Sequence, residues 1–414
     1  MKLIYTGVNT MKIGYWLGDL SVDCGGIAPY SWRLLEILLN KSKYEEIDIL
    51  VICSAELEKS CLELIHKYQA KAKPYLIPYN SSSLGIAISQ LAKFLAQILV
   101  KLNISSKKVK YLDPLFLWFA SLDIDLLHVP YQVPPYYDLP YPLIVTMHDV
   151  QELHYPEFFT PQERAWRAEH YWKSLEKSTA AIVSFNHVKQ DLIKYFRLDD
   201  NKIHVSPLPY QKMYLQPPTY KEELIYQDKY AKWGNFLLYP AQTWEHKNHL
   251  SLIKAVEYIK DKFGRLIHII CTGKKNLNFF PAIENYLKKS DVADQIHFLD
   301  IVPETELFWL YKHCLMVVIP TLYEAGCLPL LEAMSLRTPV ICSSVTSLPE
   351  TIGDSRFIFN PFDIHQISHL ILQMIDNSEL RNDNIINSKN RIKDFHQIDS
   401  AAELIKVYQK VLCT

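Results

Sequence analysis

Residues 316–334 read MVVIPTLYEAGCLPLLEAM, and this stretch shows in one place the pattern that decides the fold. The apolar run Met316 to Ile319 predicts a short buried strand, and Pro329 suits the first turn of a following helix. Glu324 falls in the loop between them, and Glu332 falls one turn inside the helix. A strand that leads through a short loop into a helix is the repeating unit of a parallel sheet covered on both faces.

The same order of apolar strands and helical patterns continues through both halves of the chain. Helices are expected over residues 27–39 and 163–177, between strands of the first half. Short continuous apolar strands separated by helices predict an α/β protein with two doubly wound domains. The expected strands are Lys12 to Leu17, Ile47 to Cys53, Leu126 to Val129, Leu143 to Met147, Ala181 to Phe185, Ile203 to Ser206, Phe236 to Tyr239, Ile267 to Cys271, Ile296 to Leu299, Met316 to Ile319 and Val340 to Cys342.

A proline-rich and charged segment separates the two expected domains. Four prolines fall between residues 207 and 218, and residues 220–232 are polar and charged. Ligands of parallel sheets bind at the carboxyl ends of the strands, so we expect the site in a central cleft that both domains face. The predicted divisions are an N-terminal Rossmann-like domain at 1–210, a linker at 211–234, a C-terminal Rossmann-like domain at 235–395, and a last helical segment at 396–414 that packs back on one of the domains, with the N-terminal one favoured.

The composition excludes several classes of protein. The chain has 414 residues, of which 49% are hydrophobic and 21% charged, so it can fill a core and is neither disordered nor collagen-like. Its 44 basic and 45 acidic residues give a net charge of -1, which disfavours a nucleic-acid partner. Its 8 cysteines form no CxxC pair, and buried free thiols in a reducing cytoplasm are the simpler interpretation.

Two features bear on targeting and membranes. The first ten residues are too short and too polar for a signal peptide, and Met11 opens a better strand, so both Met1 and Met11 are candidate starts. No apolar run reaches the roughly 18–20 residues of a membrane-spanning helix. Residues Leu84 to Asn103 carry an apolar helical face followed by lysines; a surface helix packed on a core is favoured, and a membrane-surface helix is the alternative. We expect a cytoplasmic protein, with peripheral contact to the inner face of the membrane as the alternative.

Glycine is scarce, at 11 residues, so the pair Gly25-Gly26 is informative. It falls after the first strand and before a helix, where it predicts a loop for an acceptor or a phosphate, with a simple turn as the alternative. The pair is not GxGxxG, and no GxxxxGK[ST] occurs in the chain. These absences disfavour a nicotinamide or flavin site and a P-loop nucleotide site.

Glu324 and Glu332 are the strongest candidates for chemistry. Two carboxylates at a strand-to-helix junction can each accept hydrogen bonds from the vicinal hydroxyls of a sugar or ribose. The backbone N–H groups of the loop and of the helix start can hold a phosphate. In the alternative interpretation, Glu324 only caps the helix and Glu332 is a surface charge.

The sequence at this point resembles a known family. Two glutamates separated by seven residues, with Leu328-Pro329 between them, are similar to those of the retaining glycosyltransferases of family four, which have the GT-B fold. The resemblance runs from about Met11 to the C-terminal region and is most specific in the second half. Three further segments agree with the family in order and spacing, namely residues 146–150, 239–249 and 347–350.

The resemblance implies roles for residues of the second half. Glu332 matches the glutamate that binds the ribose of the donor, and Glu324 matches the one that contacts the transferred sugar. Lys247 matches the lysine that neutralises the donor diphosphate, and a lysine at a helix start runs against the macrodipole, which favours a functional role. The alternative is a solvated surface charge. The backbone expected to face the sugar and the diphosphate belongs to Ala325, Gly326, Cys327 and Leu328.

In the first half, His148 matches the histidine that lies near the reacting sugar, and Asp149 follows it. A structural histidine beside a capping aspartate is the alternative interpretation. His246 and His249 have no nearby acidic ligand at catalytic spacing, so we expect no metal site.

The sequence departs from the family at three places. Glu324-Ala325-Gly326-Cys327 stands where the family has Glu-Gly-Phe-Gly, so two glycines are replaced. Ala241 and Gln242 occupy the stretch where many members carry an arginine. Arg337 stands where a glycine is common.

The resemblance implies a metal-independent, retaining hexosyltransferase without a cofactor. Its donor is a nucleotide-diphospho-sugar, with GDP-mannose favoured, and its acceptor is a glycan or a lipid-linked sugar. In this family a front-face mechanism is usually proposed, in which a donor phosphate oxygen takes the acceptor proton. Because of the replaced glycines, the alternative is a non-catalytic GT-B protein that binds a nucleotide-sugar or regulates a partner enzyme. A sugar-nucleotide epimerase is a second alternative, and it needs a different set of carboxylates.

Overall fold

The computed structural model describes residues 10–20, 26–78, 113–207 and 215–413. The chain divides into two compact units. The first comprises Met1–Val150, Phe159–Pro209 and Asp399–Thr414, and the second comprises Gln151–Phe158 and Tyr210–Ile398. Gly25, Met1 and the expected helix from Leu84 to Asn103 lie outside the described residues.

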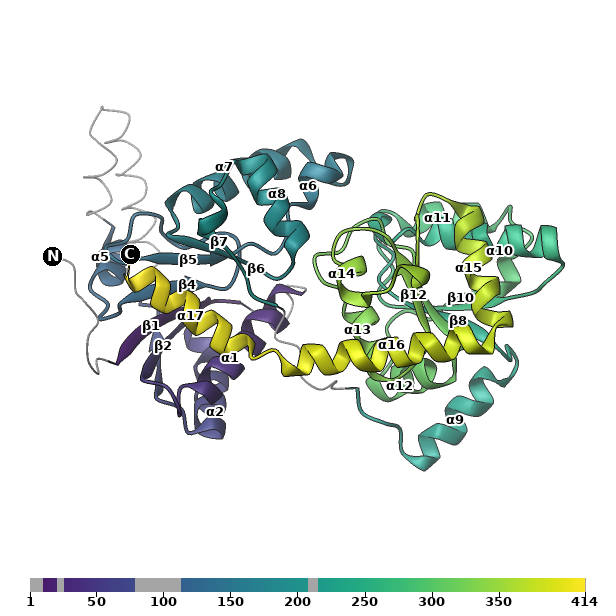
Figure 1. Cartoon of the computed structure of the whole chain (residues 1–414), viewed down its shortest axis with the longest axis horizontal. Helices are drawn as coiled ribbons and strands as arrows, with labels where there is room; N and C mark the ends of the chain where they lie inside the picture. Colours follow the sequence, from purple (N-terminus) through teal and green to yellow (C-terminus); the bar gives the residue numbers. More distant parts are fainter. Residues whose placement is uncertain (1–9, 21–25, 79–112, 208–214, 414) are drawn as a thin grey trace. The chain divides into compact units, whose positions relative to one another are not determined.

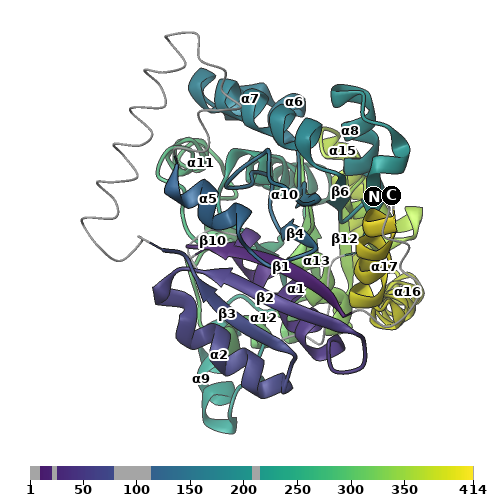
Figure 2. The same ribbon diagram turned by 90° about the vertical axis from the view of Figure 1, so that its left-hand side faces the viewer.

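The first unit is built on a seven-stranded parallel sheet with the order β3-β2-β1-β4-β5-β6-β7. Figure 2 shows β1, β2 and β3 side by side, and Met11 pairs with Ile47 at the start of β1 and β2. The strands are β1 (Met11–Gly18), β2 (Ile47–Cys53), β3 (Ala72–Leu76), β4 (Leu126–Val129), β5 (Leu143–Thr146), β6 (Ala180–Val183) and β7 (Ile203–Val205).

Helices cover the two faces of this sheet, which therefore has two hydrophobic cores. The C-terminal helix belongs to one of them: Leu404 and Tyr408 are buried beside Leu34 of α1 and Tyr15 of β1 (Figure 1). An ion pair of 2.8 Å between Lys41 and Asp399 adds to this contact. The helices of the first unit are α1 (Ile27–Lys41), α2 (Glu58–Tyr68), α5 (Pro114–Ala120), α7 (Pro161–Lys177), α8 (Asn186–Phe196) and α17 (Ser400–Cys413).

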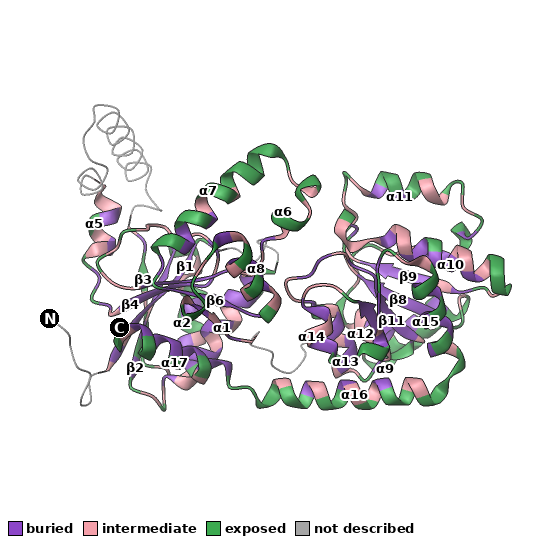
Figure 3. Ribbon diagram, turned by 45° about the horizontal axis from the view of Figure 1, so that its top comes forward, coloured by how far each residue is buried: buried purple, intermediate pink, exposed green. Residues whose placement is uncertain are grey.

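The second unit is built on a six-stranded parallel sheet with the order β10-β9-β8-β11-β12-β13. Strands β8 and β11 are neighbours, with Met316 opposite Leu237. In Figure 3 the inner strands of both sheets are buried, as continuous apolar runs require, whereas α7 and α16 present exposed faces. The strands are β8 (Phe236–Pro240), β9 (His268–Thr272), β10 (Ile296–Phe298), β11 (Met316–Ile319), β12 (Val340–Ser343) and β13 (Ile358–Phe359).

The interval 211–234 was predicted to be a linker, and the structure corrects this because it holds the helix α9 (Tyr220–Ala231). A capping box between Thr219 and Glu222 starts α9, and Tyr226 and Tyr230 bury its inner face against α12. The other helices of the second unit are α6 (Gln151–His154), α10 (His249–Phe263), α11 (Phe280–Leu287), α12 (Glu304–His313), α13 (Leu328–Ser335), α14 (Leu348–Ile352), α15 (Ile364–Asp376) and α16 (Ser378–Gln397).

Two global features follow from the described residues. No helix among them combines the length and the hydropathy needed to cross a bilayer. The cysteines among them are free thiols, and all but Cys413 are buried.

Candidate active site

Lys247 lies where the chain leaves β8 and turns into α10. It ends the short 3-10 helix η5 (Glu245–Lys247), and Asn248 then adopts the left-handed φ of 56° before α10 begins. The Asn248 side-chain amide donates to the carbonyl oxygens of Pro320 at 2.9 Å and Pro361 at 3.1 Å. The Tyr239 hydroxyl donates to the carbonyl oxygen of Lys247 at 2.7 Å. These bonds fix the backbone that presents Lys247 at the carboxyl edge of the sheet.

Glu324 lies in the loop that connects β11 to α13, and it forms an ion pair with Lys247. Because β8 and β11 are adjacent and parallel, their following loops meet at one edge. The Nζ of Lys247 lies 2.6 Å from Oε1 of Glu324, and the two side chains are only 20% and 9% exposed. Burial opposes the charged form of Lys247, but the nearby Glu324 carboxylate outweighs it and raises the pKa of Lys247. The pair therefore places a protonated ammonium at this edge.

The loop after β12 holds the backbone of Glu324 from both sides. The Glu324 N–H donates to Oγ1 of Thr346 at 3.0 Å, and the Ser347 hydroxyl donates to the Glu324 carbonyl oxygen at 3.1 Å. Thr346 has a φ of 50°, which is a strained conformation for a β-branched residue. Strain of this kind collects at functional sites, where the surrounding contacts maintain it.

Glu332 lies on α13 and contacts Tyr311 instead of Lys247. The Tyr311 hydroxyl donates to Oε2 of Glu332 at 2.6 Å. Burial raises the pKa of Glu332 above its ordinary value, the Tyr311 hydrogen bond opposes that rise, and the charge of Glu304 adds to it. In the loop before α13, Ala325 and Gly326 are half-buried and Cys327 is buried, and Leu328, the first residue of α13, is exposed. Burial raises the pKa of the Cys327 thiol well above its usual range, so this thiol stays neutral.

His148 and Asp149 belong to the first unit, directly after β5. Nε2 of His148 lies 3.0 Å from the carbonyl oxygen of Pro130, and since a carbonyl only accepts, Nε2 carries the proton. Burial lowers the pKa of His148 to about 4, so the ring is neutral with Nδ1 as an acceptor. Asp149 lies 3.9 Å from Arg167. Gly26 precedes α1 with a φ of -68°, and a Cβ there would meet no atom within 4 Å.

The structure shows the backbone surroundings of two of the departures from the family. Gly273, after β9, has a φ of 112°, and a Cβ there would lie 2.8 Å from the backbone of Ala241 and Gln242. That loop is therefore packed tightly against the end of β9. Arg337 has a φ of 58° directly after α13, where the Thr338 N–H donates to the Ala333 carbonyl oxygen at 2.9 Å. This is the Schellman position that glycine prefers.

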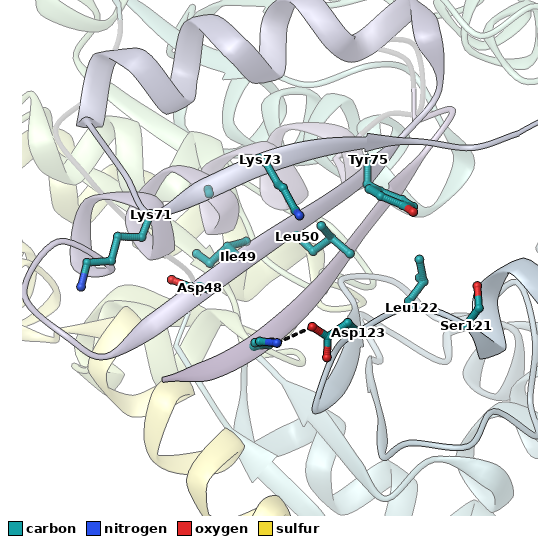
Figure 4. Close-up of a pocket in the computed structure, with 11 residues that line it drawn as sticks. Asp48, Ile49, Leu50, Lys71, Lys73, Tyr75, Ser121, Leu122 and Asp123 are labelled. Atoms are coloured by element: carbon teal, nitrogen blue, oxygen red, sulfur yellow. Dashed lines mark hydrogen bonds and ion pairs between the residues drawn. The ribbon is translucent and has the colours of Figure 1, made fainter. Parts of the chain in front are cut away.

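The described residues contain no group of three or more His, Cys, Asp or Glu side chains placed to hold a metal. His249 is buried, and burial lowers its pKa to about 3, as it does for His246. Figure 4 shows a pocket of about 480 Å³ in the first unit, lined by Lys73, Tyr75 and the ion pair of Lys12 with Asp123 among others. It adjoins the amino-terminal starts of β1 and β2, and none of the predicted site residues lines it.

Sequence reasoning missed three residues that shape this site. Tyr311 is separated from Glu332 by a strand and a loop, and nothing in its own neighbourhood distinguishes it from a core tyrosine. Thr346 could not be found because a positive φ at threonine has no sequence signal. Asn248 offered a signal, since asparagine tolerates left-handed backbone and often precedes a helix.

Comparisons with known proteins identify the family of this chain. The family profile described as "Glycosyl transferases group 1" matches residues 221–391, and the profile "Glycosyltransferase Family 4" matches residues 47–210. Among curated proteins, the O-antigen chain mannosyltransferase B of Escherichia coli is 26% identical over 283 residues, which cover 67% of this chain and 74% of that protein.

Solved structures share the fold. A glycosyltransferase from Rickettsia africae matches with a TM-score of 0.65 at 15% identity, covering 98% of this chain and 99% of that one. HepE from Anabaena, in complex with UDP and glucose, matches with a TM-score of 0.61 at 14% identity, covering 97% and 99%. At these identities the likeness concerns the fold alone, that is, the two Rossmann-like domains of a GT-B protein.

Proposed function

Because the chain belongs to the group 1, family four glycosyltransferases, we propose that it transfers a mannosyl residue from GDP-mannose to a glycan or lipid-linked acceptor, with retention of configuration. The observation that carries the proposal is the ion pair of Lys247 with Glu324 at the carboxyl edge of the second sheet. The mannosyl donor is supported by the name of the Escherichia coli relative, an O-antigen chain mannosyltransferase. The glycan or lipid-linked acceptor is consistent with that name.

In this proposal Lys247 stabilises the leaving group. Breaking the bond between the anomeric carbon and the phosphate oxygen leaves negative charge on the nucleoside diphosphate. Lys247 has three N–H donors, and one of them is directed at Glu324. The other two can bind the diphosphate, and a fixed, protonated ammonium stabilises the growing charge without reorganisation. The backbone N–H groups from Ala325 to Leu328 and the start of α13 contribute in the same direction.

Retention is proposed to follow from attack on the donor face that the leaving group occupies. The acceptor hydroxyl oxygen forms the new bond to the anomeric carbon while the bond from that carbon to the phosphate oxygen breaks. The hydroxyl proton passes to the departing phosphate oxygen, so the reaction needs no protein base. Glu324 is then left to contact the sugar and to hold Lys247 in place.

Glu332 and His148 are proposed to bind hydroxyl groups of the donor. Glu332 accepts hydrogen bonds from the ribose hydroxyls at Oε1, because the Tyr311 hydroxyl is bonded to Oε2. The neutral His148 ring, with Nε2 bonded to Pro130, accepts a sugar hydroxyl at Nδ1. Both act as acceptors, which suits a ligand rich in hydroxyl donors. The loop at Gly25-Gly26 and the residues after Val129 and Met147 are proposed to receive the acceptor.

The proposal is tested with purified protein and a panel of GDP-mannose, GDP-fucose, UDP-glucose and ADP-glucose. We expect GDP-mannose to give the fastest hydrolysis without acceptor and an α-linked product with a mannosylated acceptor, read by NMR. Faster turnover with a UDP- or ADP-sugar overturns the choice of donor. Binding of nucleotide-sugars without any turnover overturns the enzymatic role and supports the alternative of a non-catalytic binding protein. The variant Lys262→Ala, an exposed lysine near the end of α10, serves as the matched control for Lys247→Ala.

A further inference from the structure

We propose that Tyr311 is a positioning residue that orients the Glu332 carboxylate toward the two ribose hydroxyls of the donor. This inference rests on the proposed function, because it assigns a partner to the residue proposed to bind ribose. Tyr311 itself need not touch the donor. It acts through a hydrogen bond of 2.6 Å from its hydroxyl to Oε2 of Glu332.

Tyr311 is completely buried in the second unit. Its side chain has no exposed surface, although it carries a hydroxyl that must find a partner inside the protein. The shortest hydrogen bond of that hydroxyl goes to Glu332, and the carbonyl oxygen of Pro329 is a distant second at 3.4 Å. The tyrosine hydroxyl is thus committed to one carboxylate oxygen.

The backbone of Tyr311 is also fixed. The Thr338 hydroxyl donates to the Tyr311 carbonyl oxygen at 2.8 Å, from the loop that follows α13. Tyr311 is therefore held at two points, by its hydroxyl on Glu332 of α13 and by its carbonyl oxygen on Thr338 of the following loop. Because the Tyr311 ring is buried and its backbone is held, its hydroxyl points in one direction.

The direction of the Tyr311 hydroxyl also fixes the orientation of the Glu332 carboxylate. A carboxylate that accepts from Tyr311 at Oε2 cannot rotate freely, so Oε1 keeps one orientation. Adjacent ribose hydroxyls require an acceptor in a defined place, and an orientation set in advance reduces the entropy lost on binding. The Tyr311 hydrogen bond also favours the ionised form of Glu332 against its burial and the charge of Glu304, which keeps it an acceptor.

The test measures discrimination between ribose and deoxyribose. Isothermal titration gives the affinities of GDP and 2′-deoxy-GDP, with UDP and 2′-deoxy-UDP in parallel so that the base does not decide the outcome. A ribose hydroxyl bonded to a carboxylate corresponds to roughly 10- to 100-fold in affinity. We expect wild-type protein to prefer the ribonucleotide by that factor and Glu332→Ala to lose the preference.

For Tyr311→Phe we expect the preference to fall at least about fivefold while the affinity for the deoxynucleotide stays within about twofold of wild type. The matched control is Tyr230→Phe, because Tyr230 is equally buried and donates to Glu306 in the same unit. That variant should lose stability and keep the full preference.

The outcomes separate the two claims. If Glu332→Ala loses the preference and Tyr311→Phe keeps it, the positioning role is wrong and the proposed ribose contact stands. If Tyr311→Phe weakens the binding of GDP and of 2′-deoxy-GDP equally, as a purely structural change does, the positioning role is again wrong. If Glu332→Ala keeps the preference, the ribose assignment fails and the role of Tyr311 fails with it. Should Tyr311→Phe not fold, Thr338→Val replaces it, because this variant removes the hydrogen bond to the Tyr311 carbonyl oxygen. The same loss of preference for the ribonucleotide is expected, and an unchanged preference would show that the positioning role is wrong.

Discussion

The ammonium of Lys247 and the carboxylate of Glu324 lie 2.6 Å apart, although 77 positions separate them in the chain. They meet because β8 and β11 are adjacent parallel strands whose following loops emerge at one edge. The contact keeps Lys247 protonated and directed, and it gives the buried Glu324 a partner. The proposed function uses this ion pair as a preorganised charge for the anion that develops during the reaction.

We predict that Thr346→Gly separates activity from stability. Glycine adopts the φ of 50° without strain, and relief of that strain offsets its larger unfolded-state entropy, so the melting temperature should stay the same or rise. The loss of the hydroxyl that accepts from the Glu324 N–H should lower kcat about tenfold, equivalent to a barrier of about 1.4 kcal/mol. Thr346→Ser keeps the hydroxyl and should keep kcat. Wild-type turnover in Thr346→Gly would show that the Thr346 contact does not matter for catalysis.

Arg337→Gly is predicted to stabilise the protein by roughly 0.5–1 kcal/mol. The left-handed conformation costs a residue other than glycine about 1–2 kcal/mol, and the larger entropy that glycine loses on folding cancels part of this gain. Chemical unfolding of the two proteins measures the difference, and activity should not change. Arg337→Ala provides the control, since alanine keeps the same backbone penalty. An unchanged or lower stability of Arg337→Gly would mean that the arginine side chain makes a compensating contact.

A third prediction concerns pH and the buried His128 of the first unit. Its Nδ1 lies 2.7 Å from the Tyr408 hydroxyl and its Nε2 lies 3.1 Å from Oγ1 of Thr146. Burial lowers the pKa of His128 to about 3, against 6.5 in the unfolded chain. Between these values the unfolded state binds more protons, so stability falls as the pH falls.

The measurement is the free energy of unfolding at pH 7 and pH 5 for wild type and His128→Gln. Glutamine can serve both partners but does not titrate. Wild type should lose roughly 2 kcal/mol more than the variant over this interval. Equal losses in the two proteins would show that His128 is charged in the folded state or that the effect arises elsewhere.

Most of the fold could be predicted from the sequence, because continuous apolar strands and helices alternate regularly. The edge strands β3 and β13 were missed for physical reasons. Strand β3 is largely exposed and contains Pro74, and β13 has two residues, so neither shows a buried apolar run. Helix α9 was missed although Thr219 and Glu222 carry the spacing of a capping box.

The sequence indicated candidate residues for the site but did not predict their contacts. Glu324, Glu332 and Lys247 stand out because charged groups follow buried strands or start helices. Their partners depend on which strands are neighbours and on side-chain direction, which no local pattern encodes. The pairing of Glu332 with Tyr311, instead of with Lys247, is an example.

A fourth prediction is that turnover does not depend on a divalent cation. In the proposed function, Lys247 and the start of α13 supply the positive potential that a metal ion supplies in other transferases. Activity in excess EDTA should equal the untreated rate, and added Mg²⁺ or Mn²⁺ should change it less than about twofold. Activity that EDTA abolishes and Mn²⁺ restores would contradict the assignment of Lys247 as the neutralising group.

The kinetics of Lys247→Ala with GDP-mannose test whether Lys247 stabilises the leaving diphosphate. If Lys247 stabilises charge that develops on the leaving diphosphate, its removal should lower kcat by about 100- to 1,000-fold and raise KM for the donor by much less. Lys247→Arg should recover part of the rate, because the charge is kept and the geometry changes. Lys262→Ala should match wild type, and circular dichroism should confirm that each variant is folded. A folded Lys247→Ala with wild-type kcat would contradict the account and place the diphosphate away from the ion pair with Glu324.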